Sequence, residues 1–170
     1  MNTPLSEHST KPISAGLRLG TMLLDHALIC FIGIPPVIVW QYLTQENGSA
    51  APTSPYLMMP FFVIYFCKDC IGGRSAAKRI LKLAVVRNKA GTPATPLQCL
   101  IRNLLVIIWP VEVVVASFNQ QQRIGDWLAG TKLTYYDSTK KSQLQIIQIV
   151  VAIVMATLIT YLLIILFERI

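Results

Sequence analysis

Charged side chains are scarce in this chain. Only 14% of its 170 residues are Asp, Glu, Lys or Arg, and 54% are hydrophobic, whereas about 25% charged residues is usual for a soluble domain. Histidine occurs twice, and neither a Ser-His-Asp set nor a His-Glu-x-x-His motif is apparent. The composition therefore excludes an ordinary soluble domain and argues against an enzyme, and no cofactor is expected.

The basic residues lack the pattern of a nucleic-acid-binding protein. Lys and Arg number 15 against 8 acidic residues, a net charge of +7, but they lie beside apolar runs with no repeated basic–aromatic alternation. The sequence therefore predicts no nucleic-acid partner. The expected partners of these charges are the lipid bilayer and its anionic phospholipids.

Cysteine is also sparse, with four residues. Cys67-Lys-Asp-Cys70 is a single CxxC motif without a second pair or neighbouring histidines, which is weak evidence for zinc or redox chemistry. Small thiols commonly pack in apolar surroundings. We therefore expect packing here, and no metal site.

The chain is rich in long apolar runs. Leu17–Trp40 is long enough to cross a hydrocarbon core of about 30 Å, although Pro35-Pro36 is expected to kink or end that helix. A shorter aromatic run begins at Tyr56 and ends at about Cys67 or Cys70. Ile146–Phe167 is an uninterrupted apolar run of twenty-two residues. These runs predict membrane-spanning helices.

Basic residues give the predicted orientation. Seven Lys or Arg lie between residues 68 and 89, and none lies in 41–55. The positive-inside rule then places 68–96 and the N-terminus in the cytoplasm of a bacterium and 41–55 outside its inner membrane. A single crossing by 97–118 would put the next basic loop outside. We therefore favour a re-entrant hairpin bent at Pro110 over a crossing, and this alternative stays open.

The basic segment predicts a surface helix and a strand. Ser75 is a suitable N-cap for a short amphipathic helix, and Leu83–Val86 is strand-like, as is Lys132–Tyr136. These two strands are expected to meet in a small sheet. The residues expected at the level of the lipid headgroups are Arg74, Ser75, Lys78, Arg79 and Lys82.

The predicted fold is an all-α membrane protein. It has three to four transmembrane helices, a cytoplasmic amphipathic helix, the re-entrant hairpin if 97–118 does not cross, and a two-stranded cytoplasmic element. The predicted organisation is a flexible tail at 1–15, a membrane domain at 16–137, and a linker with a C-terminal transmembrane helix at 138–170.

Ionisable residues inside the first apolar run point to a buried polar site. A carboxylate at mid-bilayer depth costs about 2.5–3.5 kcal/mol on insertion scales, so Asp25 needs a partner. Arg18 lies two helical turns earlier on the same face. We expect a buried charge network made of Arg18, Asp25, Arg102, Glu112, Arg123 and Asp126. Structural stapling of the helices is favoured over ion transport and over a ligand or headgroup site, and the residues leave all three open.

Small residues recur at four-residue spacing in two runs. They are Gly16 and Gly20 in the first, and Ala152, Ala156 and Thr160 in the last. This spacing allows close contact between helices. Contact within one chain and contact between chains both fit, and for the last run we expect another helix to dock there.

Three separated motifs together resemble the RDD family of small integral membrane proteins, which is named for an arginine and two aspartates. Arg18 and Asp25 match the first two. Asp126 matches the second aspartate within Arg123-Ile-Gly-Asp-Trp-Leu-Ala-Gly-Thr131. Gly73-Arg-Ser-Ala-Ala-Lys-Arg-Ile-Leu81 is similar to a further family segment, with Ala77 in place of its usual second glycine. The similarity covers about residues 14–137, and the last apolar run looks like an addition.

The resemblance implies a membrane domain whose biochemical role is mostly unassigned. Ion or proton-coupled transport and service as an accessory module have both been proposed for the family, and it brings no settled catalytic residue or cofactor. We expect a non-enzymatic module, a subunit or organiser of a membrane assembly, with a membrane-protein partner or a homo-oligomer. The alternative is an oligomeric cation or proton transporter that uses Asp25 and Asp126.

Overall fold

The computed structural model of the protein describes residues 13–46, 55–105, 114–115, 123–136 and 145–169. The predictions that concern Glu112, the bend at Pro110 and most of the N-terminal tail lie outside these residues. The elements follow one another as α1 (Ala15–Glu46), the 3₁₀ helix η2 (Pro55–Met58), α2 (Met59–Cys67), α3 (Ala76–Ile80), β1 (Leu83–Arg87), α4 (Pro96–Leu104), α6 (Ile124–Ala129), β2 (Thr131–Tyr135) and α7 (Ile146–Glu168).

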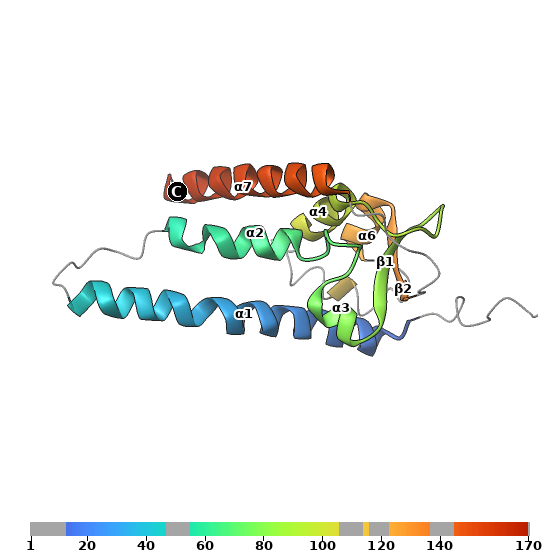
Figure 1. Ribbon diagram of the computed structural model, residues 1–170, viewed down its shortest axis with the longest axis horizontal. Coiled ribbons are helices and arrows are strands. Elements are labelled where there is room, and N and C mark those ends of the chain that lie inside the picture. Colours follow the sequence, from blue (N-terminus) through green and yellow to red (C-terminus); the bar gives the residue numbers. More distant parts are fainter. Residues whose placement is uncertain (1–12, 47–54, 106–113, 116–122, 137–144, 170) are drawn as a thin grey trace, which may run out of the picture.

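The elements form two zones (Figure 1). Helices α1, α2 and α7 lie lengthwise in one zone. The short helices α3, α4 and α6 and the two strands gather around one end of these three helices. We call this second zone the cap. The protein is therefore mostly helical, with one small sheet, as the sequence predicts.

Helices α1 and α7 are long and apolar enough to cross a membrane. Only 11% of the most apolar stretch of α1 and 22% of that of α7 is buried inside the protein. Phe31 on α1 is 80% exposed and Ile147 on α7 is 81% exposed. The core helix of a soluble protein would be mostly buried, and apolar faces of this extent are typical of contact with lipid or with another membrane helix.

The proline pair does not end the first helix. Pro35 and Pro36 lie inside α1, which continues to Glu46. Each proline removes a backbone hydrogen bond, at a cost of about 3 kcal/mol in water. In hydrocarbon, however, leaving the helix would expose many more unsatisfied backbone groups. Of the two expected effects, an end of the helix at this pair is therefore wrong, and a kink stays a prediction.

The second apolar run is shorter than a full crossing. Helix α2 has 9 residues and η2 has 4, whereas a transmembrane helix needs about 20. Two helices therefore meet the length of a span among the described residues. The total of three to four spans stays a prediction.

The predicted sheet is present. Strands β1 and β2 pair antiparallel, from Leu83 opposite Tyr135 to Arg87 opposite Thr131. Gly73 lies against β1 with φ of +69°, and a Cβ there would come within 2.5 Å of the Val85 carbonyl oxygen. Only glycine fits this close approach, which holds the start of α3 beside the sheet.

The predicted packing positions divide into two groups. Ala152 and Ala156 are fully buried and Thr160 is 1% exposed, on the helix that packs against α2 and α4 of the same chain. A Cβ on Gly16 or Gly20 would meet no atom of the described residues within 4 Å, so these residues of the chain make no close helix contact there, and contact between chains stays a prediction. Both glycines are exposed, whereas the neighbouring Arg18 and Thr21 are buried, so the described residues cover the other face of α1 at this level.

The close glycine contact on α1 is at Gly33 instead. A Cβ on Gly33 would lie 1.3 Å from Cε1 of Phe61 on α2. The ring of Phe61 therefore occupies the space that a side chain would fill. This contact brings α1 and α2 together in the apolar zone.

Candidate functional site: a buried ion-pair chain

Asp69, in the turn after α2, is completely buried in the cap. Its Oδ1 lies 2.8 Å from Nζ of Lys78, and its Oδ2 lies 3.3 Å from Nη1 of Arg102. Nδ2 of Asn103 also donates to Oδ2, at 3.3 Å. The carboxylate therefore lies between one cation from α3 and another from α4.

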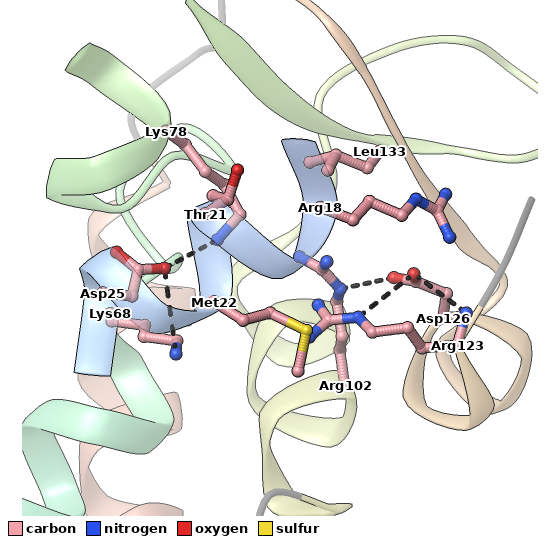
Figure 2. Close-up of a pocket in the computed structure, with 10 residues that line it drawn as sticks. All are labelled: Arg18, Thr21, Met22, Asp25, Lys68, Lys78, Arg102, Arg123, Asp126 and Leu133. Carbon is pink, nitrogen blue, oxygen red and sulfur yellow. Dashed lines mark hydrogen bonds and ion pairs between the residues drawn. The ribbon is translucent and has the colours of Figure 1, made fainter. Parts of the chain in front are cut away.

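Asp25 on α1 is held by the start of α3. It accepts hydrogen bonds from the Ser75 hydroxyl at 2.8 Å, from Nζ of Lys78 at 3.1 Å and from the backbone N–H of Ala77 at 3.3 Å. Lys68 adds a second cation, with Nζ 3.8 Å from Oδ2 of Asp25 (Figure 2). Ser75 is the N-cap of α3, as predicted, because its hydroxyl also accepts from the backbone N–H of Lys78.

Asp126 on α6 lies between two arginines. Nε of Arg102 donates to Oδ1, and Nε of Arg123 lies 3.6 Å from Oδ2. The backbone N–H of Arg123 donates to Oδ2 at 3.3 Å, and the Thr131 hydroxyl donates to Oδ1 at 3.4 Å. Asp126 is therefore both an ion-pair partner and a cap for the first turn of α6.

These contacts join into one series of alternating charge, which we call the ion-pair chain. Its members in order are Asp25, Lys78, Asp69, Arg102, Asp126 and Arg123. The series connects α1, α3, the turn after α2, α4 and α6. A buried charge costs several kcal/mol unless it is paired, so each member depends on its neighbours.

The ion-pair chain lowers the pKa of two of its acids, Asp69 and Asp126. Burial alone would raise the pKa of Asp69, but Lys78 and Arg102 outweigh it and hold that pKa below the usual value. Burial opposes ionisation of Asp126 in the same way, and Arg102 and Arg123 bring its pKa below the usual value. For Lys68, burial and the nearby Lys78 lower the pKa to about 8.

A small polar cavity lies along this series (Figure 2). Its volume is about 10 Å³, room for roughly one water molecule. The Arg18 side chain, 3% exposed, points toward the Asp126 end of the cavity and away from Asp25. Arg18 and Asp25 therefore share one site without forming the direct pair that their spacing suggested.

Of the predicted network, five residues border this one cavity: Arg18, Asp25, Arg102, Arg123 and Asp126. Among the described residues, no group of three or more His, Cys, Asp or Glu side chains is placed to hold a metal ion. The three aspartates of the ion-pair chain are separated by cations. The arrangement is suited to holding helices together.

Two residues expected at the lipid headgroups lie elsewhere. Lys78 is 3% exposed and Ser75 is 2% exposed, because both are bound to Asp25. Arg74 is half-buried and stacks on Tyr136, at 3.7 Å from the ring centre. Arg79 and Lys82 are exposed, and their headgroup contact stays a prediction.

Sequence reasoning missed Asp69 and Lys68. Both lie inside the Cys67–Cys70 motif, which was interpreted from its two cysteines alone and not from the two charged residues between them. Cys70 packs in the core at 2% exposure, and Cys67 lies against the same core cluster. The available signal was an adjacent cation and carboxylate directly after an apolar helix, where unpaired charges are costly.

The two apolar helices and the buried charge series define a helical membrane protein with an ionic cap at one end. Residues 12–169 match the sequence profile of the RDD family, and the chain belongs to that family. The match includes α7 and so extends beyond the motifs at about 14–137. Neither a curated protein nor a solved structure matches the chain.

Proposed function

We propose that this protein is a non-enzymatic integral membrane module, and a subunit or organiser of a membrane assembly. The observation that carries the proposal is that each of the three carboxylates in the ion-pair chain contacts two basic side chains. Against the effect of burial, Lys78 and Arg102 hold the pKa of Asp69 below its usual value, and Arg102 and Arg123 do the same for Asp126. A carboxylate with a lowered pKa is a poor proton carrier. Such a chain fixes the mutual positions of helices and presents a rigid cap to a partner.

The proposed setting is the bacterial inner membrane, with the cap and the N-terminus in the cytoplasm. The support is the density of Lys and Arg between residues 68 and 89, most of which belong to the cap. Cytoplasmic segments beside membrane spans carry this excess of basic residues. The partner is another membrane protein or a second copy of the chain.

Transport of a cation or proton is the second candidate. It is favoured by the polar cavity that Asp25 and Asp126 both border, and by Lys68, whose pKa of about 8 allows a change of charge near neutral pH. The cavity has room for roughly one water. A pathway would therefore need further surfaces from an oligomer.

Asp25→Asn and Asp126→Asn distinguish the two functions. For a scaffold, both variants lower the thermal midpoint in mild detergent and lose the proteins that co-purify with the wild type. For a transporter, both abolish proton or cation flux in proteoliposomes while the same proteins co-purify as with the wild type. Glu168→Gln is the control, because Glu168 is exposed and lies at the end of α7 that is farthest from the cap. Normal stability and partners together with lost flux would overturn the scaffold.

A further inference from the structure

A second cavity of about 640 Å³ lies between α1, α2 and α7. We call it the apolar groove, because most of its lining consists of aliphatic and aromatic side chains. Its volume falls within the roughly 300–1,000 Å³ that is usual for ligand sites. On α1 the lining runs from Leu19 to Ile38, roughly 28 Å at 1.5 Å per residue. The groove is therefore about as long as a hydrocarbon core is thick.

The apolar groove and the small polar cavity meet at one place. Met22, Lys68 and Arg123 line both. The groove therefore has two cations at its cap end and apolar side chains along most of its length. A molecule that fills it needs a long hydrocarbon part and a negatively charged end.

Lys68 is weakly compensated inside the protein. Its side chain is 10% exposed, and its one ion pair among the described residues is the 3.8 Å contact with Asp25. That carboxylate is already bound by Lys78 at 3.1 Å. The Lys68 ammonium also lies 4.0 Å from the centre of the Tyr65 ring. Asp25 therefore neutralises the Lys68 ammonium only in part. An anion bound near Lys68 and Arg123 would add the missing negative charge.

We infer that the apolar groove binds one anionic phospholipid, with a hydrocarbon chain along α1, α2 and α7 and its phosphate at Lys68 and Arg123. The groove lies between the two helices long enough to span a membrane, so bilayer lipid has direct access to it. Basic pockets between membrane helices commonly bind anionic headgroups. A packed apolar helix would leave the two cations without an added anion, so charge complementarity favours the lipid. This site goes beyond the scaffold role and does not depend on it.

Binding of phosphatidylglycerol by the full chain tests the inference. Phosphatidylglycerol in mixed micelles should raise the thermal midpoint and remain bound in native mass spectra, and phosphatidylcholine should do so much less. Lys68→Gln should weaken phosphatidylglycerol binding about fivefold, the effect of one cation. Lys68→Arg should restore it. The matched control is Lys132→Gln, which removes an exposed cation of β2 and should change nothing.

Two neighbouring substitutions on α7 test the part of the site that would hold the hydrocarbon chain. Leu163 lines the apolar groove, whereas the preceding Leu162 is 63% exposed and is not part of the lining. Leu163→Trp should displace at least two methylene groups of the chain and weaken binding about tenfold. Leu162→Trp should bind as the wild type does.

The wild-type protein gives a test that no folding defect can obscure. Photoreactive phosphatidylglycerol should crosslink to groove residues such as Met22 and Leu163, and not to Phe31, which is exposed and outside the groove. Three results would overturn the inference: equal binding of both lipids with no effect of Lys68→Gln, crosslinks spread evenly over the outer faces, or a dimer that Leu163→Trp dissociates. The last would assign the groove to a second copy of the chain.

Discussion

Asp69 is the residue on which the ion-pair chain depends most. It is fully buried and joins Lys78 to Arg102, and so joins the Asp25 end to the Asp126 end. Its neighbours on either side are cations with side chains 3% and 1% exposed. Without the carboxylate, two buried positive charges face each other.

Asp69→Asn should therefore be strongly destabilising. Removing one partner from a buried pair costs about 3–5 kcal/mol, because the remaining charge is left uncompensated. We expect a large drop in the thermal midpoint in detergent and poor recovery of folded protein. Glu168→Gln is the comparison. Glu168 is exposed, and the glutamine amide oxygen can still accept the hydrogen bond from Tyr56, so the substitution should cost less than about 1 kcal/mol. Equal thermal midpoints for the two variants would show that the ion-pair chain does not stabilise the cap.

The same carboxylates predict the response to acid. The pKa values of Asp69 and Asp126 lie below those of an unfolded chain, so the folded protein binds fewer protons than the unfolded one. Their stabilisation is complete above the unfolded pKa of about 4 and is lost as the pH falls toward the folded values. Thermal unfolding from pH 6 down to pH 2.5 should show a falling midpoint. In Asp69→Asn the decline should be shallower, and an unchanged slope would contradict the assignment.

At the scale of elements, α7 belongs to the bundle and is more than an anchor. Its small-residue face packs on α2 and α4 of the same chain, while neighbouring positions such as Val154 are 52% exposed. The family match also runs through this helix. The docking helix that the small residues predicted is therefore supplied, at least in part, by this chain itself.

Ala156→Leu tests that packing. Ala156 is fully buried, so three added carbons must displace α2 or α4, at about 1–3 kcal/mol. We expect a lower thermal midpoint. Val154→Leu changes an exposed position of the same helix and should be close to neutral. If Ala156→Leu melts like the wild type, the contact of α7 with α2 and α4 is looser than the burial of Ala156 indicates.

The elements were more predictable from the sequence than their contacts. Strands β1 and β2 and the last helix follow from local patterns of hydropathy and β-branched residues. The continuation of α1 through Pro35 and Pro36 could not be predicted in this way, because the rule that proline breaks a helix was established for helices in water. The role of Asp69 and Lys78 was missed, because only tertiary packing brings the end of α2 and the start of α3 together. The order of the six residues in the ion-pair chain could not be predicted from their spacing in the sequence.

At the scale of the whole molecule, the arrangement fixes which ends lie on the same side. Helix α1 begins at the cap and ends away from it, α2 returns to the cap, and α7 again runs from the cap to the C-terminus (Figure 1). The far end of α1 and the C-terminus are therefore at the same end of the molecule, opposite the cap. This relation holds whether or not residues 97–118 enter the membrane.

Cysteine labelling with a membrane-impermeant reagent tests this topology in intact cells. In a background without Cys30 and Cys67, the two native cysteines that are not fully buried, single cysteines would replace Gly48, Lys89, Ser138 and Arg169. The positive-inside rule places the basic cap in the cytoplasm, and the arrangement of helices places the C-terminus opposite the cap. Positions 48 and 169 should therefore be labelled from outside, and 89 and 138 only after the membrane is permeabilised. Labelling of 89 and 138 but not of 48 and 169 would invert the orientation while keeping the fold. Labelling of 48 with protection of 169 would show that α7 does not cross the membrane in the direction that its packing against α2 requires.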